Sequence, residues 1–295
     1  MPSIKDLRKR IVSTKNTQQT TKAMKMVSAA KLRRAQEAIQ NHRPYAKNMI
    51  DLIRTLSDLA KGEVNSPFVP RKMAEGVKPR LLLLVVTSDR GLCGGFNANV
   101  IKGAAKFVQA NESQYSLIRF GFLGRKGYEF FRNRIVEIGP YFPDLGGKVS
   151  FDKATQLADA LVKNYLVGEV DEIKIIYNEF KNAASQETKV MNFLPIQSEV
   201  AADEVAVAQP PYLVKPSAPQ VLEELLAKNF SVQTFRVMLE SQAGEHGARM
   251  SAMENATKNA GEMIRKLTLQ YNKQRQAGIT KELLEIISGS ESQKG

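Results

Sequence analysis

The chain has 295 residues, 43% of them hydrophobic, which is enough to bury a sizeable core in one or two domains. Its formal net charge of +13 favours an acidic partner: nucleic acid, an anionic membrane surface or an acidic protein. Cys93 is the only cysteine and His42 and His246 lie far apart, which excludes a disulfide framework and a Cys/His zinc site and is typical of a reducing cytosol. The longest apolar run, residues 81–86, is too short to span a bilayer, and the N-terminus lacks the apolar region of a signal peptide. We therefore expect any membrane association to be peripheral.

The positive charge is concentrated at the start of the chain. Residues 1–61 contain 14 Lys and Arg against 4 Asp and Glu, residues 62–211 contain 18 against 17, and residues 212–295 contain 11 against 9. Prolines cluster at both borders, in 67–79 and 210–219, where neither a helix nor a central strand should cross. The sequence thus predicts an N-terminal coiled-coil helix in 1–61, an α/β domain in 62–211 and a C-terminal coiled-coil helix in 212–295.

The first part begins with a capping-box pattern, Ser3 and Asp6, which predicts a helix start near residue 4. From there a 3,4 spacing continues without a slip over residues 4–60, and this is the period of a coiled coil. Pro44 interrupts the backbone hydrogen bonding, so we expect one long helix with a local kink. The alternative is two helices broken at Arg43.

The last part mirrors the first, with Ser217 and Gln220 as its start signal and Ser288–Gly289 as its stop. Sixteen positions at 3,4 spacing lie in 222–274, and eleven of them are apolar or tyrosine. Because the middle domain is inserted between the two helices, they should leave it in the same direction and pair antiparallel. At about 1.5 Å per residue the last helix is the longer, so AGITKELLEIIS should overhang its partner by about two or three turns.

The middle part alternates strand and helix patterns, which indicates a compact, Rossmann-like α/β sheet domain. The first strand has no polar alternation, so both of its faces should be buried. The predicted elements are strands at 80–89, 115–124 and 172–180, helices at 96–110 and 153–168, and an edge strand at 187–196.

SDRGLCGGFN, residues 88–97, follows a strand and opens a helix, where a phosphate-binding loop would lie. However, the P-loop lysine is absent after Gly94 and Gly95, and the dinucleotide G-x-G-x-x-G spacing is absent too. We therefore expect Gly91, Gly94 and Gly95 to supply positive φ angles and close packing at a tight turn, and Cys93 to be a packed side chain rather than a nucleophile.

The remaining candidates for chemistry are few. His42 and His246 occupy seam positions of the two helices and should fill space between them. No general acid/base pair, metal cluster or catalytic triad stands out, so we predict no active site in this chain and no bound cofactor or metal.

Three separated stretches, in order, resemble the gamma subunit of F-type ATP synthases. They are KNTQQTTKAMKMVSAAKLRRAQ in the first helix, SDRGLCGGFN after the first strand, and ESQAGEHGARMSAMENATKNA with LTLQYNKQRQAGITKELLEIISG in the last helix. The resemblance covers essentially the whole chain. The chain lacks the extra cysteine pair of the redox-regulated chloroplast form and a transit peptide, which favours a bacterial type.

The resemblance implies a long antiparallel coiled coil of N- and C-terminal helices with an inserted Rossmann-like α/β domain. Such a subunit is the rotor shaft that couples proton flow to ATP synthesis or hydrolysis in the ring of alpha and beta subunits. Its foot would contact the epsilon subunit and the membrane c-ring, at the cytoplasmic face of the bacterial plasma membrane. A shaft that passes three equivalent subunits in turn needs shallow contacts, and exposed ion pairs of about 0–1 kcal/mol each are easily exchanged.

The resemblance also implies residues that contact the ring. In the last helix, Arg249, Arg275, Gln276 and Thr280 match positions that meet the beta subunits' catch loop. Some relatives hold an acidic residue where this chain has Lys25, so its local charge pairing should differ. In the first helix, the expected contact residues are Met24 and Lys25, with Lys9, Arg10, Arg33 and Arg34 as basic companions.

The overhang carries a broad apolar face, which would favour aggregation in water and therefore predicts an apolar sleeve in the ring around the tip. The face comprises Ile279, Leu283, Leu284, Ile286 and Ile287. Two other functions are compatible with parts of this sequence. A basic coiled-coil nucleic-acid binder would need aromatic side chains for stacking, and the first helix has only Tyr45. An autonomous nucleotide enzyme would bind and hydrolyse ATP as the isolated chain, which we do not expect.

Overall fold

The computed structural model describes residues 3–59, 66–71, 76–134, 137–143, 149–183, 185–196, 214–215 and 217–292. The chain divides into two compact units, the first formed by Met1–Ser28 with Arg249–Gly295 and the second by Ala29–Ala248. Both borders of the predicted α/β domain, after residues 61 and 211, lie outside the described residues.

The N-terminal helix, α1, extends over Ile4–Leu59 and is continuous through Pro44, which confirms one helix rather than two. Its start carries the predicted capping box: the Asp6 backbone N–H donates to Ser3 Oγ at 3.2 Å, and the Ser3 N–H donates to the Asp6 carboxylate at 3.2 Å. These two bonds satisfy backbone donors that a helix start leaves without an intrahelical partner.

The C-terminal helix, α5, extends over Ala218–Ser292. Ser217 Oγ donates to Gln220 Oε1 at 3.2 Å at its start, as the S-x-x-Q pattern predicted. The predicted stop at Ser288–Gly289 is wrong, because the helix continues through Gly289 for three more residues. A glycine ends a helix when it adopts a positive φ, and Gly289 does not do so here.

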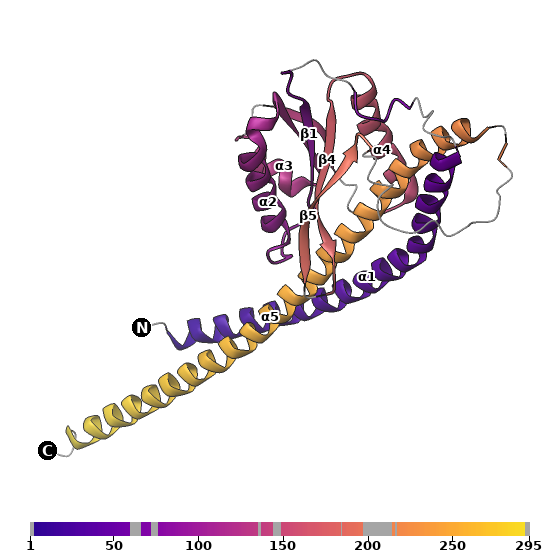
Figure 1. Ribbon diagram of the computed structural model, residues 1–295. Helices are drawn as coiled ribbons and strands as arrows, with labels where there is room; N and C mark the ends of the chain where they lie inside the picture. Colours follow the sequence, from indigo (N-terminus) through magenta and orange to yellow (C-terminus); the bar gives the residue numbers. More distant parts are fainter. Residues whose placement is uncertain are drawn as a thin grey trace. The chain divides into compact units, whose positions relative to one another are not determined.

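Within the first unit the two helices pair antiparallel, as predicted (Figure 1). Ile4 lies beside Gly278, whereas Lys25, further along α1, lies beside Glu254. Partner numbers on α5 therefore fall as those on α1 rise. The start of α1 lies level with Gly278, so α5 overhangs it by about four turns rather than the predicted two or three.

The second unit contains a five-stranded sheet with the strand order β3-β2-β1-β4-β5 (Figure 1). The first four strands run parallel, and β5 pairs antiparallel with β4 at one edge, which confirms the predicted edge strand. The elements are β1 (Arg80–Val86), α2 (Phe96–Asn111), the short 3-10 helix η1 (Glu112–Gln114), β2 (Leu117–Leu123), α3 (Arg125–Phe131), β3 (Ile138–Phe142), α4 (Phe151–Leu166), β4 (Glu172–Phe180) and β5 (Gln186–Leu194).

Three of these elements, η1, α3 and β3, were not predicted from the sequence. Helix α3 has only seven residues, which is too short for a helical period to stand out. Strand β3 contains Pro140, a residue that normally argues against a strand, and it is tolerated because β3 lies at the free edge of the sheet.

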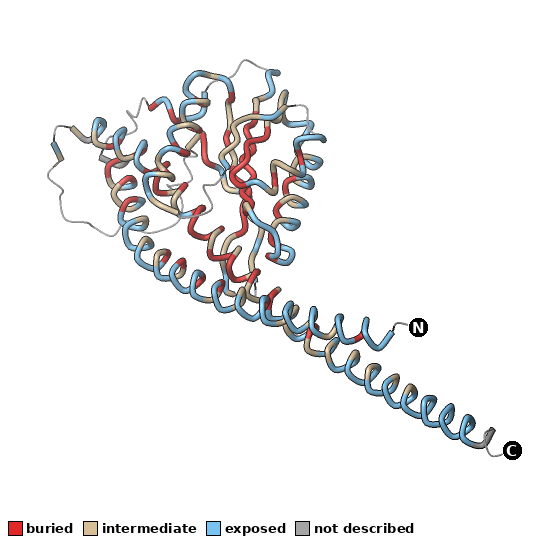
Figure 2. The backbone as a smooth tube through the Cα atoms, turned by 180° about the vertical axis from the view of Figure 1, so that it is seen from behind, coloured by how far each residue is buried: buried red, intermediate tan, exposed pale blue. Residues whose placement is uncertain are grey.

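Strand β1 is buried on both faces, as its sequence predicted, with Leu81–Val86 between 0 and 2% exposed (Figure 2). Alternate residues enter two separate core clusters. Leu81, Leu83 and Val85 pack with α2 on one face of the sheet. Leu82, Leu84 and Val86 pack on the other face with α4, the second-unit part of α5 and the end of α1.

The first proline-rich stretch forms neither helix nor strand in its described residues, as predicted, yet it is fixed to the core. The Phe68 ring is buried and lies 5.0 Å from that of Phe230 in an edge-to-face arrangement. Its carbonyl accepts a hydrogen bond from the Ile196 N–H at 2.9 Å. This stretch is therefore part of the domain, not a free linker.

Candidate functional site

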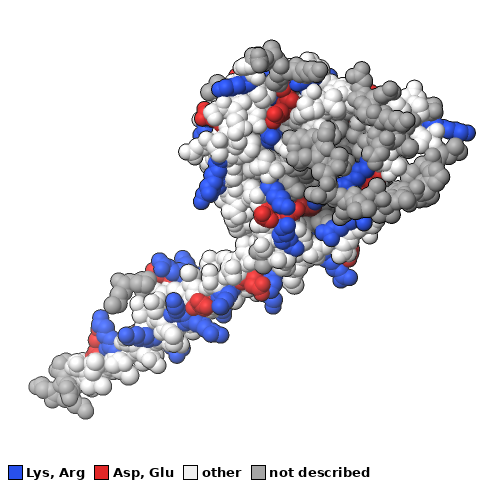
Figure 3. All heavy atoms as spheres, viewed as in Figure 1, with Lys and Arg blue, Asp and Glu red and all other residues white. Residues whose placement is uncertain are grey.

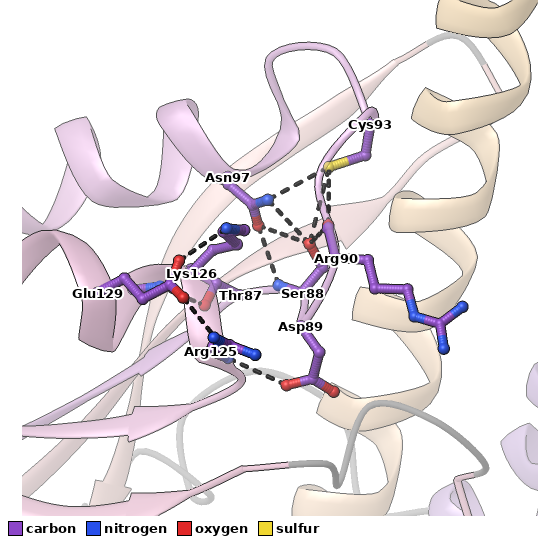
Figure 4. A network of polar contacts seen from close by, with 10 residues as sticks. Thr87, Ser88, Asp89, Arg90, Cys93, Asn97, Arg125, Lys126 and Glu129 are labelled. Atoms are coloured by element: carbon purple, nitrogen blue, oxygen red, sulfur yellow. Dashed lines mark hydrogen bonds and ion pairs between the residues drawn. The ribbon is translucent and has the colours of Figure 1, made fainter.

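The loop that could have bound phosphate is instead closed by its own side chains (Figure 4). Ser88 Oγ donates to the Arg90 carbonyl at 2.6 Å, and the Ser88 N–H donates to Asn97 Oδ1 at 2.9 Å. The Asn97 amide donates in turn to Ser88 Oγ at 2.8 Å and to Cys93 Sγ at 3.3 Å. The polar groups that would face a ligand thus bind each other, and the buried Cys93 is a packed side chain, as predicted.

The backbone of this loop differs from the prediction in one respect. Gly94 has a positive φ of 56°, but Gly91 and Gly95 do not, and the second positive φ, 63°, belongs to Leu92. The prediction that all three glycines supply positive φ angles is therefore wrong. Gly95 instead precedes the first turn of α2, where its N-cap position has a helical φ.

The cavity at the carboxyl ends of β1 and β2 is small. In open α/β sheets a ligand crevice forms at such strand ends. Here Met238 and Ser241 of α5 cover Thr87 and Leu123, and the remaining cavity is about 20 Å³, enough for about one water molecule. No cluster of metal-binding side chains occurs in the described ranges, and none of the helices described is long and apolar enough to cross a membrane.

The two helices of the first unit meet along a polar seam. Thr257 Oγ1 donates to Thr21 Oγ1 at 2.8 Å, and Gln18 Nε2 lies 3.4 Å from the Thr257 carbonyl oxygen. About one helical turn away, Lys25 Nζ lies 2.6 Å from Glu254 Oε1. The seam therefore contains matched polar pairs here.

The partners of these seam residues on α5 were not identified from the sequence. They can be recognised only from the register of the two helices, which brings Glu254 opposite Lys25 and Thr257 opposite Thr21. Lys25 therefore has a counter-charge within the chain.

The predicted contact residues differ in exposure, and Figure 3 shows Lys and Arg side chains along the helices. Arg33 pairs with Glu37 at 3.0 Å, and Thr280 Oγ1 donates to the Gln276 carbonyl within its own helix. Those exposed are Lys9, Arg10, Arg33, Arg34, Arg275, Gln276 and Thr280, and those half-buried are Met24 and Lys25.

Arg249 differs from the other predicted contact residues, because it is only 9% exposed. Arg275, in contrast, is exposed and makes no hydrogen bond or ion pair within the described part of the chain. A partner could therefore reach Arg275 without displacing an existing bond, whereas Arg249 would first have to leave its buried position.

The predicted apolar tip lies on the overhang of α5, beyond the start of α1. Its five members are between 50 and 68% exposed, so nothing within the described chain covers them. Such a contiguous exposed apolar face is typical of an interaction site. They are Ile279, Leu283, Leu284, Ile286 and Ile287.

The two histidines lie against helix neighbours. His42 Nε2 lies 3.3 Å from the Val232 carbonyl oxygen, and its ring contacts Phe235 edge-to-face at 5.0 Å. Burial lowers the pKa of His42, which keeps the ring neutral in this apolar contact. His42 thus fills space against α5, as predicted. His246 is buried, and its expected place between the two helices stays a prediction.

Comparison with known proteins identifies a family that matches the chain. The ATP synthase family matches residues 3–292. The ATP synthase gamma chains of Geotalea uraniireducens and Geobacter metallireducens are each 48% identical over 295 residues, covering 100% of both chains.

Solved structures agree at the level of the fold. A chain of the Euglena gracilis mitochondrial ATP synthase, in a structure titled OSCP/F1/c-ring, rotational state 3, matches with a TM-score of 0.65 at 21% identity, covering 98% of this chain and 94% of that one. A chain from the central stalk/c-ring structure of the Tetrahymena thermophila enzyme matches with a TM-score of 0.60 at 24% identity, covering 80% and 99%. The chain belongs to the ATP synthase gamma chain family.

Proposed function

We propose that this chain is the central rotor shaft of an F-type ATP synthase, coupling proton flow through the membrane sector to ATP synthesis or hydrolysis. The observation that carries this proposal is the 48% identity to ATP synthase gamma chains over the full length of both chains. A shaft needs no active site of its own, and the closed loop at Ser88 and the small cavity beside it agree with that role.

The partners that fit are the alpha and beta subunits around the shaft, with epsilon and the c-ring at its foot. Support comes from the exposed basic residues of α1, which suit acidic lobes on a ring and form weak, exchangeable contacts. The subunit would associate peripherally with the membrane through the complex, at the cytoplasmic face of a bacterial plasma membrane. Family membership favours this over the nucleic-acid alternative, and a steep salt dependence of binding to random DNA would reverse that preference.

The exposed apolar tip suits an apolar sleeve formed by the ring. Non-directional apolar contact varies little with angle, so it lets a helix turn, whereas fixed hydrogen bonds would favour particular angles. Burying an aliphatic side chain contributes about 1.5–3 kcal/mol, so a sleeve around Leu284 and Ile287 would add substantially to assembly.

The sleeve is tested by changing Leu284 and Ile287 together to Asp. We expect the free chain to become more soluble and to keep its thermal stability, because both side chains are exposed. Reconstitution with alpha and beta subunits should weaken, measured as the yield of assembled complex. Val77→Asp, at another exposed apolar residue, is the matched control and should assemble normally. Undiminished assembly of the double variant would show that the tip has no apolar partner.

The predicted contacts of Arg275 and Gln276 are tested separately. Both side chains are exposed, and an arginine can form charge-assisted hydrogen bonds to one beta subunit at a time. Changing both to Ala should slow ATP turnover of the assembled complex while leaving assembly intact. The neighbouring exposed pair Asn272 and Lys273, changed to Ala, serves as the control. Equal turnover in the two double variants would refute the assignment.

A further inference from the structure

Two glycines lie in the middle of α5, within the second unit, where a helix does not favour them. Gly244 and Gly247 are both buried, and a spacing of three residues puts them on the same face of the helix. Glycine is a poor helix former compared with alanine. A reason for the two glycines must therefore be found in what the helix packs against.

The surroundings of Gly247 leave no space for a side chain. A Cβ atom there would lie 2.9 Å from the carbonyl oxygen of Ala183 and 3.2 Å from its Cα. Ala183 belongs to the turn between β4 and β5, so the obstacle is backbone and cannot rotate away.

Gly244 is enclosed by side chains rather than by backbone. A Cβ atom there would lie 3.1 Å from the ring of Phe96, at the start of α2, and 3.3 Å from Cγ of Gln186, at the start of β5. The α/β domain thus approaches the backbone of α5 closely at two successive turns.

A charged contact extends the same face of α5 towards its N-terminus. Glu240, one turn before Gly244, accepts a hydrogen bond from Arg236 Nε at 2.8 Å and is buried. Burial, together with the nearby charge of Glu240, raises the pKa of Tyr177 in the middle of β4. Glu240, Gly244 and Gly247 therefore face the domain from Tyr177 to the β4–β5 turn.

These contacts admit only one placement of the helix. In the segment from Glu240 to Met250 the two glycines are the only residues without a Cβ atom. Sliding or rotating α5 by one residue would bring the side chain of a neighbour, such as Glu245 or Ala248, into the space that the Ala183 carbonyl and the Phe96 ring fill.

We propose that close packing at Gly244 and Gly247 holds α5 at a fixed axial and rotational position against the α/β domain. We call this packing contact the joint. This inference rests on the proposed function: if the chain is a rotor shaft, the joint transmits torque between the α/β domain and the shaft. The two glycines are then positioning residues for coupling, although neither contacts a nucleotide or a proton.

The first test uses the isolated full-length chain and three Gly→Ala variants of α5. Gly247→Ala should lower the melting temperature by about 4 °C, because the obstacle is backbone. Gly244→Ala should lower it less, because the Gln186 side chain can move. Gly289→Ala, with nothing within 4 Å, should leave it unchanged or raise it. Amide hydrogen exchange at residues 181–186 should be about tenfold faster in Gly247→Ala only. If all three variants have the same melting temperature and exchange, the joint does not exist.

The second test uses the assembled complex and measures protons pumped per ATP hydrolysed. Gly247→Ala should retain assembly and ATP hydrolysis but lower this ratio at least about twofold, whereas Gly289→Ala should match the wild type. If the glycine had only a structural role, Gly247→Ala would lower the yield of assembled complex but leave the number of protons pumped per ATP unchanged. That result would overturn the proposal. If the wild-type chain itself failed to restore coupled turnover to complexes lacking this subunit, the proposed function would be wrong. The first test would still show whether the joint exists, because it uses the isolated chain.

Discussion

Strand β1 and the first 28 residues represent two ways of holding a segment in place. All six residues of Leu81–Val86 are buried, and each is held by apolar contact on one face of the sheet. In residues 4–28 only Leu7, Thr21 and Ser28 are buried, and the seam is held by paired polar groups. Apolar burial contributes more stability than exposed polar pairs, so the two regions should respond to mutation on different scales.

The difference suits the two roles. A domain that holds the shaft must resist deformation, and close packing provides this because small volume changes are costly. A helical segment that passes successive partners needs an outer surface without deep apolar contacts. The polar seam lets the two helices pair while most side chains of residues 4–28 stay exposed.

The largest effect is expected for Leu83→Ala in the centre of β1. The side chain is fully buried against α2, so its loss should destabilise the chain by about 3 kcal/mol in urea unfolding. Val12→Ala in α1 removes an exposed apolar side chain and should cost less than about 0.5 kcal/mol. Similar costs for the two variants would refute the comparison.

A smaller effect is expected for Asp171→Asn in the second unit. Asp171 Oδ2 accepts hydrogen bonds from both the Arg80 backbone N–H and Nε at 2.9 Å, and these lower the pKa of its carboxyl group. The variant should lose about 1–2 kcal/mol at pH 7.

The pH dependence of this effect has a defined sign. A lowered pKa means that the stabilisation is present above the ordinary value of 3.8 and disappears as the pH falls through the folded-state value. The difference between wild type and Asp171→Asn should therefore shrink below about pH 4. A difference for Asp171→Asn that stayed constant with pH would contradict the pairing with Arg80.

The seam threonines should behave as a coupled pair. Thr257→Val alone leaves the Thr21 hydroxyl without this partner and should cost about 1 kcal/mol. Adding Thr21→Val should restore most of that loss, because both polar partners are then replaced by apolar groups of similar shape. A double-mutant cycle in urea unfolding measures the coupling, and strictly additive costs would show that the hydroxyl contact contributes nothing.

The smallest effect is expected for Lys25→Gln. Its partner Glu254 is more than half exposed, so the pair should contribute less than about 1 kcal/mol. Raising the salt concentration to about 0.5 M should screen most of that difference. A loss that persisted at high salt would mean that Lys25 acts through packing of its aliphatic part.

Local patterns in the sequence were sufficient for the elements that carry strong signals. The capping box of Ser3 and Asp6, the 3,4 spacing and the unbroken apolar run of β1 each predicted what the structure contains. These signals depend on residues close together in the chain, so they can be recognised without knowing the fold. The exposed contact residues and the apolar tip were also identified from the sequence, and their contacts stay predictions.

Other features of the structure depend on contacts between residues that are distant in the sequence. Helix α3 and strand β3 are short, and β3 tolerates Pro140 only because it is an edge strand. The end of α5 was misjudged because Gly289 stops a helix only when it adopts a positive φ, and nothing here imposes that conformation. Thr257 and Glu254 became recognisable as partners of Thr21 and Lys25 only when the register was known.

The sequence by itself thus determined the helix, sheet domain and helix order of this protein, because amphipathic period, caps and apolar runs are local properties. Only the tertiary structure decided the register of the two helices and the role of Gly244 and Gly247. By intrinsic propensity both glycines are unfavourable within a helix. They are required because the Ala183 carbonyl and the Phe96 ring, distant in sequence, occupy the space where a Cβ atom would lie.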